Sequence, residues 1–131
     1  MSDHFRTVKT YLHDLNLAIE EEHPEEELVI VHDEDRGIHR LIVDCEEPIV
    51  ILEQAIMPIP KKPGDLYKRL LELNRTLIHG AFAIDEETGT VLFRDTLQLD
   101  TLDRGEIEGS INALSLALAE NAEELLSYSK K

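Results

Sequence analysis

The sequence contains few of the residues that usually carry reactive chemistry. It has no tryptophan, one cysteine, and only 5% aromatic residues in 131. A single cysteine cannot form an intramolecular disulfide, so we expect a reducing environment and a core built from aliphatic side chains. Because Cys45 lies between Asp44 and Glu46, the acidic neighbours raise the pKa of its thiol, which argues against a redox or catalytic role.

Sequence motifs for nucleotide binding or hydrolysis are also missing. The chain has no Gly-x-x-x-x-Gly-Lys phosphate loop, no Gly-x-Gly-x-x-Gly turn and no Gly-x-Ser-x-Gly elbow. We therefore predict a protein that is not an enzyme, with no catalytic residues, cofactor or metal.

Basic residues are scarce, since 13 Lys and Arg face 28 Asp and Glu and the formal net charge is -15. This charge repels phosphate backbones and anionic lipid headgroups, so we expect neither a nucleic-acid nor a membrane partner. The acidity serves either solubility alone or the selection of partners by charge, and the sequence leaves both open. We expect a cytoplasmic protein, because the N-terminus does not resemble a signal peptide and no apolar run approaches the roughly 18 residues of a membrane span.

The first half of the chain alternates between helical and strand patterns. Apolar residues spaced by three and four predict a first helix, and they are Phe5, Val8, Leu12, Leu15 and Ile19. The acidic stretch 20–27 that follows predicts a solvated loop. Strands are predicted at 28–31 and 38–43, joined by a hairpin turn, and a third at 49–59. Apolar residues at both parities of 49–59 predict a central or interface strand covered on both faces.

The second half repeats the alternation, and the length fits one domain, 1–131. A helix is predicted from about residue 65 to 79, then a hairpin with strands at 81–85 and 90–97. A last helix begins after Asp103, which has capping-box spacing to Glu106. The predicted order is α-β-β-β-α-β-β-α, an α+β fold with helices packed on an antiparallel sheet.

The helix near residues 66–78 carries more apolar surface than one sheet face requires. One stripe contains Leu66, Leu70, Leu73 and Leu77, and an adjoining one contains Tyr67, Leu71 and Ile78. We predict that the second stripe packs on another subunit, with full burial inside one chain as the alternative. The predicted dimer interface consists of Leu66, Tyr67, Leu70, Leu71, Asn74 and Ile78.

The order of elements and several short sequence motifs together resemble the type III secretion chaperone-like family, which includes Tir-chaperone and YbjN-like proteins. The resemblance is carried by residues 70–75, the strand entry 80–85, the Gly89 turn and residues 97–103. It implies a small acidic cytosolic homodimer without enzymatic activity that holds segments of a client protein on exposed apolar surface. By this resemblance the first helix and first three strands form the client surface. The predicted client-binding residues are Val29, Val31, Leu41 and Val43, for which core packing is the alternative.

Two other functions remain open at this stage. A small regulator or adaptor of the same fold would bind one folded partner instead of an extended client. A metal-dependent enzyme would use the first hairpin, where His32, Asp33 and His39 lie close in sequence to Asp35. Their spacing matches no strong ligand motif, and imidazoles and carboxylates at a turn usually form a solvated charge cluster.

Overall fold

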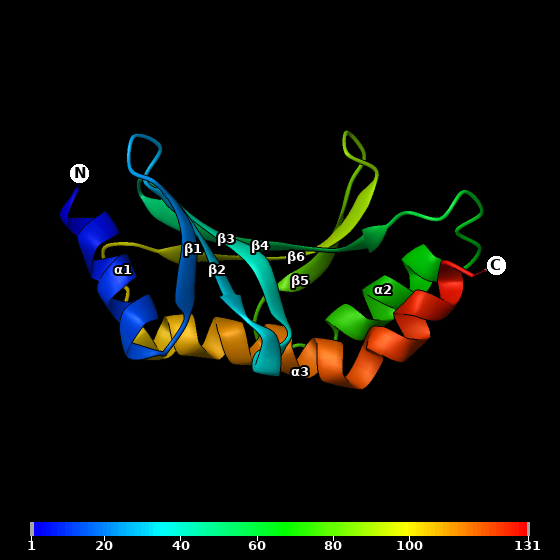
Figure 1. The fold of residues 1–131 in the computed structure, drawn as a ribbon. Helices are drawn as coiled ribbons and strands as arrows, with labels where there is room; N and C mark the ends of the chain where they lie inside the picture. Colours follow the sequence, from blue (N-terminus) through cyan, green and yellow to red (C-terminus); the bar gives the residue numbers. More distant parts are fainter. Residues whose placement is uncertain (1, 131) are drawn as a thin grey trace.

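The computed structural model describes residues 2–130 and contains one six-stranded antiparallel sheet with three helices on one of its faces (Figure 1). The strand order is β1-β2-β3-β4-β6-β5. This confirms the predicted α+β class. The elements are α1 (Asp3–Asp14), β1 (Ala18–His23), β2 (Leu28–Asp33), the short 3-10 helix η1 (Glu34–Arg36), β3 (Ile38–Glu46), β4 (Ile49–Pro58), α2 (Leu66–Asn74), β5 (Ala81–Asp85), β6 (Thr90–Gln98) and α3 (Arg104–Tyr128).

The prediction of a long first helix followed by an acidic loop was wrong. Helix α1 begins at its N-cap Ser2 and ends at Asp14, because Asn16 adopts a left-handed φ of 62° and Leu17 N–H bonds back to the carbonyl of Leu12 at 3.1 Å. The chain then extends into β1, which pairs with β2. The sheet therefore has one more strand than predicted, and that strand contains the first half of the acidic stretch, residues 20–23.

Strand β4 lies between β3 and β6, as expected of a central strand. Its inward residues Val50 and Leu52 are fully buried, whereas Ile49 and Ile51 on the opposite face are only half-buried. The helices cover one face of the sheet, so the expectation that both faces of this strand are covered holds only for the inner one.

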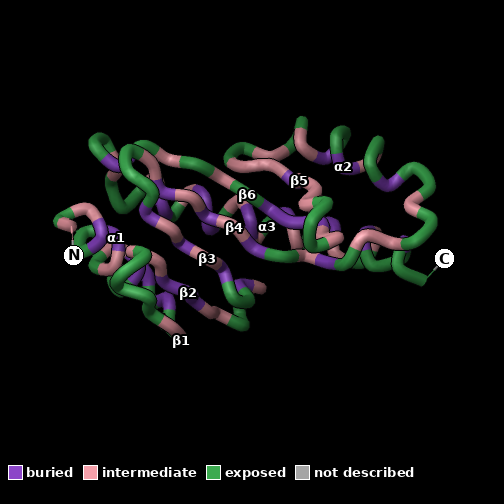
Figure 2. The backbone as a smooth tube through the Cα atoms, turned by 90° about the horizontal axis from the view of Figure 1, so that it is seen from above, coloured by how far each residue is buried: buried purple, intermediate pink, exposed green. Residues whose placement is uncertain are grey.

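The core consists of two clusters that α3 connects. The first joins α1, β2, β3, β4, β6 and the first half of α3, and the second joins α2, β5, the adjoining ends of β4 and β6, and the second half of α3. Figure 2 shows the buried stretches along β3, β4 and β6 above α3. Asp103 caps α3 by accepting a hydrogen bond from the Glu106 N–H at 2.8 Å. Helix α3 has 25 residues, yet no helix within residues 2–130 is long and apolar enough to cross a membrane.

The molecule is elongated, and its two shorter helices lie at opposite ends. Figure 1 shows α1 beside β1 at one end, α2 at the other, and α3 running beneath the sheet between them. Surfaces at α1 and at α2 are therefore separate candidates for interaction.

Candidate functional site

The four predicted client-binding residues lie in the core. Val29, Val31, Leu41 and Val43 are each no more than 1% exposed and belong to the first core cluster. In the ladder of β2 and β3, Val29 faces Val43 and Val31 faces Leu41, on the side of the sheet that the helices cover. The expectation that they form an exposed patch is corrected, since burial satisfies their apolar surface within the chain.

The surface at this end of the molecule is instead the edge strand β1. Five of its six residues are exposed, and Glu21 is half-buried. Within residues 2–130 strand β1 pairs with β2 alone, so the other edge of β1 is not paired with a strand. The strand also contains a bulge between Ile19 and Glu21. An edge of this kind presents backbone N–H and C=O groups to any extended chain that approaches it.

The acidic side chains of β1 are held on both faces of the strand. Arg40 Nη1 lies 2.7 Å from Glu21 Oε2, and the hydrogen bond from Arg40 lowers the pKa of Glu21 below its ordinary value. Lys9 of α1 bonds Glu22 at 3.1 Å. Helix α1 and strand β3 thus brace β1 through its side chains.

The first hairpin does not assemble a metal site. Asp33 is engaged by the guanidinium of Arg36, which also donates to the carbonyl of Leu15 at 2.7 Å. The hydrogen bond from Arg36 lowers the pKa of Asp33. The rings of His32 and His39 lie 5.2 Å apart between centroids. Within residues 2–130 no group of three or more His, Cys, Asp or Glu side chains is placed to hold a metal ion.

Helix α2 separates its two apolar stripes as the sequence suggests. Leu66, Leu70 and Leu73 are at most 4% exposed and belong to the second core cluster. Tyr67 is 45% exposed and Leu71 is 72% exposed. Of the predicted interface, Leu66 and Leu70 are thus used inside the chain, and Tyr67 and Leu71 remain on the surface.

The predicted helix is longer than the observed one, and its last residues form a turn. Helix α2 ends at Asn74, so Ile78 lies in the connection to β5, where it is 83% exposed. Ile78 lines a groove of about 260 Å³ whose opposite wall is α3 and includes Leu116, which is 54% exposed. Exposed apolar side chains are therefore found on α2, on the following turn and on the middle of α3.

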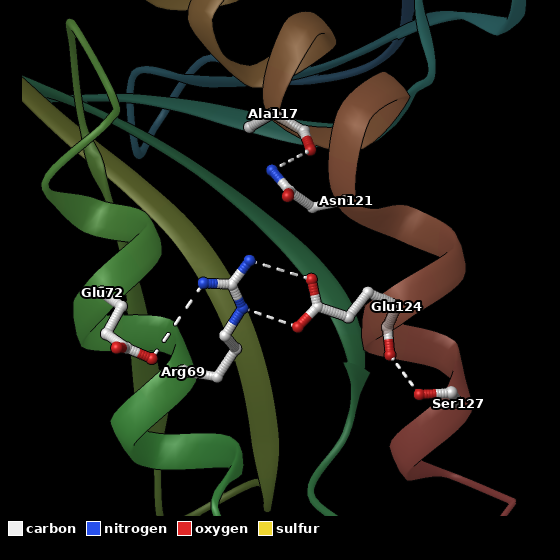
Figure 3. A network of polar contacts seen from close by, with 6 residues as sticks. All are labelled: Arg69, Glu72, Ala117, Asn121, Glu124 and Ser127. Atoms are coloured by element: carbon white, nitrogen blue, oxygen red, sulfur yellow. Dashed lines mark hydrogen bonds and ion pairs between the residues drawn. The ribbon is translucent and has the colours of Figure 1, made fainter.

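A polar network fixes α2 against α3 (Figure 3). Arg69 makes a bidentate contact with Glu124, at 2.6 Å from Nε and 3.1 Å from Nη2, and its Nη1 lies 4.0 Å from Glu72. The hydrogen bond from Arg69 lowers the pKa of Glu124. Asn121, one turn earlier in α3, donates to the carbonyl of Ala117 at 3.0 Å. The contacts hold α2 with Tyr67 and Leu71 on its outer side.

Asn74, the remaining residue of the predicted interface, points back into its own chain. Its carboxamide Nδ2 donates to the carbonyl oxygen of Phe82 at 3.1 Å, and its Oδ1 accepts from the Phe82 N–H at 2.7 Å. Asn74 was predicted to lie in the dimer interface. The reversal of the chain at Gly80 instead brings β5 next to the last residue of α2.

The single cysteine offers no reactive site. Cys45 is 5% exposed, and burial, followed by the nearby Glu27 carboxylate, raises the pKa of its thiol to about 12. The thiol stays protonated at neutral pH and acts as a small core side chain.

The same fold occurs in several solved structures. YbjN from E. coli, a proposed transcription regulator, superposes with a TM-score of 0.66 at 13% identity, covering 92% of each chain. A chain of the ExoT–SpcS complex from Pseudomonas aeruginosa gives 0.63 at 17% identity, over 92% of this chain and 98% of the other. A chain of the HopA1–SchA chaperone–effector complex gives 0.61 at 12% identity, over 100% and 99%. At identities of 12 to 17%, the likeness shows a shared fold and does not by itself show a shared function.

At the level of sequence, the family model CesT_Tir_1 matches residues 1–131. No protein with a curated description matches the chain significantly.

Proposed function

The chain belongs to the CesT_Tir_1 family of type III chaperones, and we propose on this basis that it is a non-catalytic protein that holds extended segments of a client. The similar chains from the HopA1–SchA and ExoT–SpcS complexes come from assemblies with another protein, which supports a protein partner here. The observation that carries the proposal is β1, an exposed strand at the free edge of the sheet.

Strand addition at β1 supplies what an unfolded client segment requires. The open edge satisfies the backbone of the segment by hydrogen bonding, and exposed surface beside the edge takes its alternate side chains. Consecutive glutamates at 20–22 favour a segment that carries Lys or Arg. They also disfavour pairing of β1 with the β1 of a second copy, because that arrangement brings like charges together.

We propose that the chain forms a homodimer through the opposite end of the molecule. Tyr67 and Leu71 form the exposed apolar side of α2, and Ile78 continues it in the following turn. The contact between Arg69 and Glu124 holds α2 in place without a partner. Because α1 and α2 lie at opposite ends, a dimer formed at α2 leaves both copies of β1 accessible.

The test uses a synthetic peptide of alternating Lys and Val, and a control peptide of the same length with proline at every other position. Proline removes backbone donors, so it cannot pair along the edge. The alternating peptide is expected to slow amide hydrogen exchange across residues 18–23, and the proline peptide is expected to leave it unchanged. Binding should weaken as salt concentration rises.

Charge reversal provides a matched pair of variants. Glu20→Lys with Glu22→Lys should abolish binding of the alternating peptide. Glu86→Lys with Glu87→Lys changes the net charge equally in the distant turn between β5 and β6 and should leave binding intact. Equal loss in both variants would show that net charge alone attracts the peptide. Binding only to a folded protein, with no protection of β1, would support the adaptor alternative instead.

A further inference from the structure

The outer edge of β5 is occupied by a side chain from the neighbouring helix. Strand β5 is the last strand on its side of the sheet and pairs with β6. Asn74, the final residue of α2, both donates to and accepts from the backbone of Phe82, at 3.1 and 2.7 Å. Two opposed residues of an antiparallel ladder exchange the same pair of hydrogen bonds. The carboxamide therefore imitates one residue of an adjacent strand.

We propose that Asn74 is an edge-blocking residue, which closes β5 to strand addition by a client or a second copy and so leaves β1 as the edge where strands add. The inference holds whether or not the chain serves as a chaperone, because it concerns which edge of the sheet accepts a strand.

The length of β5 makes one blocked residue sufficient. Outward-facing backbone groups alternate along a strand, so a strand of five residues with Phe82 facing outward presents Phe82 and Ile84 at that edge. With Phe82 occupied by Asn74, an incoming strand can exchange hydrogen bonds at Ile84 alone. Even a complete two-stranded pair is marginal in water, so a single exchange does not hold a strand.

The two edges of the sheet differ in how they avoid unwanted pairing. Strand β1 carries three consecutive glutamates and a bulge, both of which discourage association between copies. The first four residues of β5, Ala81 to Ile84, carry no charge. An uncharged edge needs another form of protection, and the Asn74 carboxamide supplies it.

Both partners of the contact are held rigidly. Leu70 and Leu73 anchor α2 in the second core cluster. The ring of Phe82 is 4% exposed and meets Phe93 edge-on, with centroids 6.5 Å apart. Gly80 has a φ of +71°, and a Cβ there would lie 2.4 Å from the Phe93 ring of β6, so glycine is required where the chain turns into β5.

The experiment uses Ala83→Cys as a reporter of pairing between two β5 strands. If two β5 edges pair antiparallel about Ala83, its two copies form a non-hydrogen-bonded pair, whose Cα separation suits a disulfide. The native Cys45 is buried and does not compete. The reporter is placed in three backgrounds: the native chain, Asn74→Ala, and Thr76→Ala. The Thr76 hydroxyl donates to the Leu73 carbonyl at 2.7 Å. Thr76→Ala therefore removes a hydrogen bond from the same turn and keeps the bonds between Asn74 and Phe82.

Disulfide formation under mild oxidation should be at least tenfold faster in the Asn74→Ala background than in the native or Thr76→Ala backgrounds. Exchange of the Phe82 amide should also be roughly tenfold faster in Asn74→Ala at dilute concentration, since its hydrogen bond is lost. Asn74→Asp keeps the acceptor but loses the donor, so its rate of disulfide formation should fall between those of the native and Asn74→Ala backgrounds. It replaces the alanine variant if that variant fails to fold.

Equal disulfide formation in all three backgrounds, at matched folded fractions from circular dichroism, would overturn the proposal. Asn74 would then only stabilise the turn. The light-scattering mass of the native chain, which tests the dimer at α2, is independent of this result.

Discussion

Asp44 lies where an ionised carboxylate is unfavourable, and its replacement should stabilise the protein. It occupies the outer face of β3, with Leu28 and Ile51 as its cross-strand neighbours. Its Oδ1 is buried and has no hydrogen-bond partner within residues 2–130. Burial, followed by the charge of Glu46 and then of Glu26 and Glu53, raises the pKa of Asp44 to about 6 from an ordinary value of 3.8.

The sign of the pH dependence follows from this direction. Between the two pKa values the native protein holds a proton at Asp44 that the unfolded chain has released, so the free energy of unfolding falls as pH rises through this window. A shift of about two units corresponds to about 3 kcal/mol in full. Because the side chain is partly solvated, we expect about 1 kcal/mol at pH 7.5.

Asp44→Asn keeps the shape of the side chain, removes its charge, and offers an amide N–H near the Glu46 carboxylate. The variant should be more stable than the native chain by about 1 kcal/mol at pH 7.5, with the difference vanishing near pH 4. Groups with other shifts, including His4 with its raised pKa and Glu27 with its lowered pKa, are common to both proteins and cancel in the comparison.

Urea unfolding at pH 4, 6 and 7.5 measures the effect, and Asp35→Asn at an exposed position of η1 is the matched control. The control should change stability little at any pH. The reasoning fails if Asp44→Asn is no more stable than the native chain at pH 7.5. It also fails if the gain is the same at all three pH values.

Three further outcomes follow from the structure. Leu71→Glu should convert the proposed dimer to a monomer by light scattering, whereas Leu126→Glu, at a comparably exposed leucine of α3, should leave the mass unchanged; a dimer in both variants would contradict the α2 interface. Gly80→Ala should cost about 2 kcal/mol more in urea unfolding than Gly89→Ala, because both have positive φ but only the first meets Phe93; equal costs would exclude that clash. Cys45 should react with a thiol reagent only on unfolding, and rapid labelling of the folded chain would show that it is accessible.

The fold class could be predicted from the sequence because most elements carry a clear apolar period. Strand β1 could not be found that way, since an edge strand with acidic residues on both faces has no apolar alternation. The local signal was present at its start. Leu15 and Leu17 alternate and are both buried, and the Asn16 between them suits the left-handed conformation that ends α1.

The candidate site was predicted less completely, for two physical reasons. Alternation in β2 and β3 identifies which residues share a face but not which face the helices cover, so Val29 and Val43 could be read as surface or core. Asn74 was predicted in the dimer interface, but its side chain bonds the backbone of Phe82, which the chain reversal at Gly80 brings next to it. The sequence did predict that Tyr67 and Leu71 lie on a separate stripe of α2. The regular spacing of the buried leucines beside them fixed which side of the helix faces the core.

Native mass spectrometry of the chain mixed with the alternating Lys and Val peptide tests most directly whether the two ends of the molecule serve different partners. We expect two chains with up to two peptides, since a dimer formed at α2 leaves each β1 edge accessible. A single chain bound to one peptide, or a dimer that dissociates as peptide is added, would contradict the separation of the two surfaces.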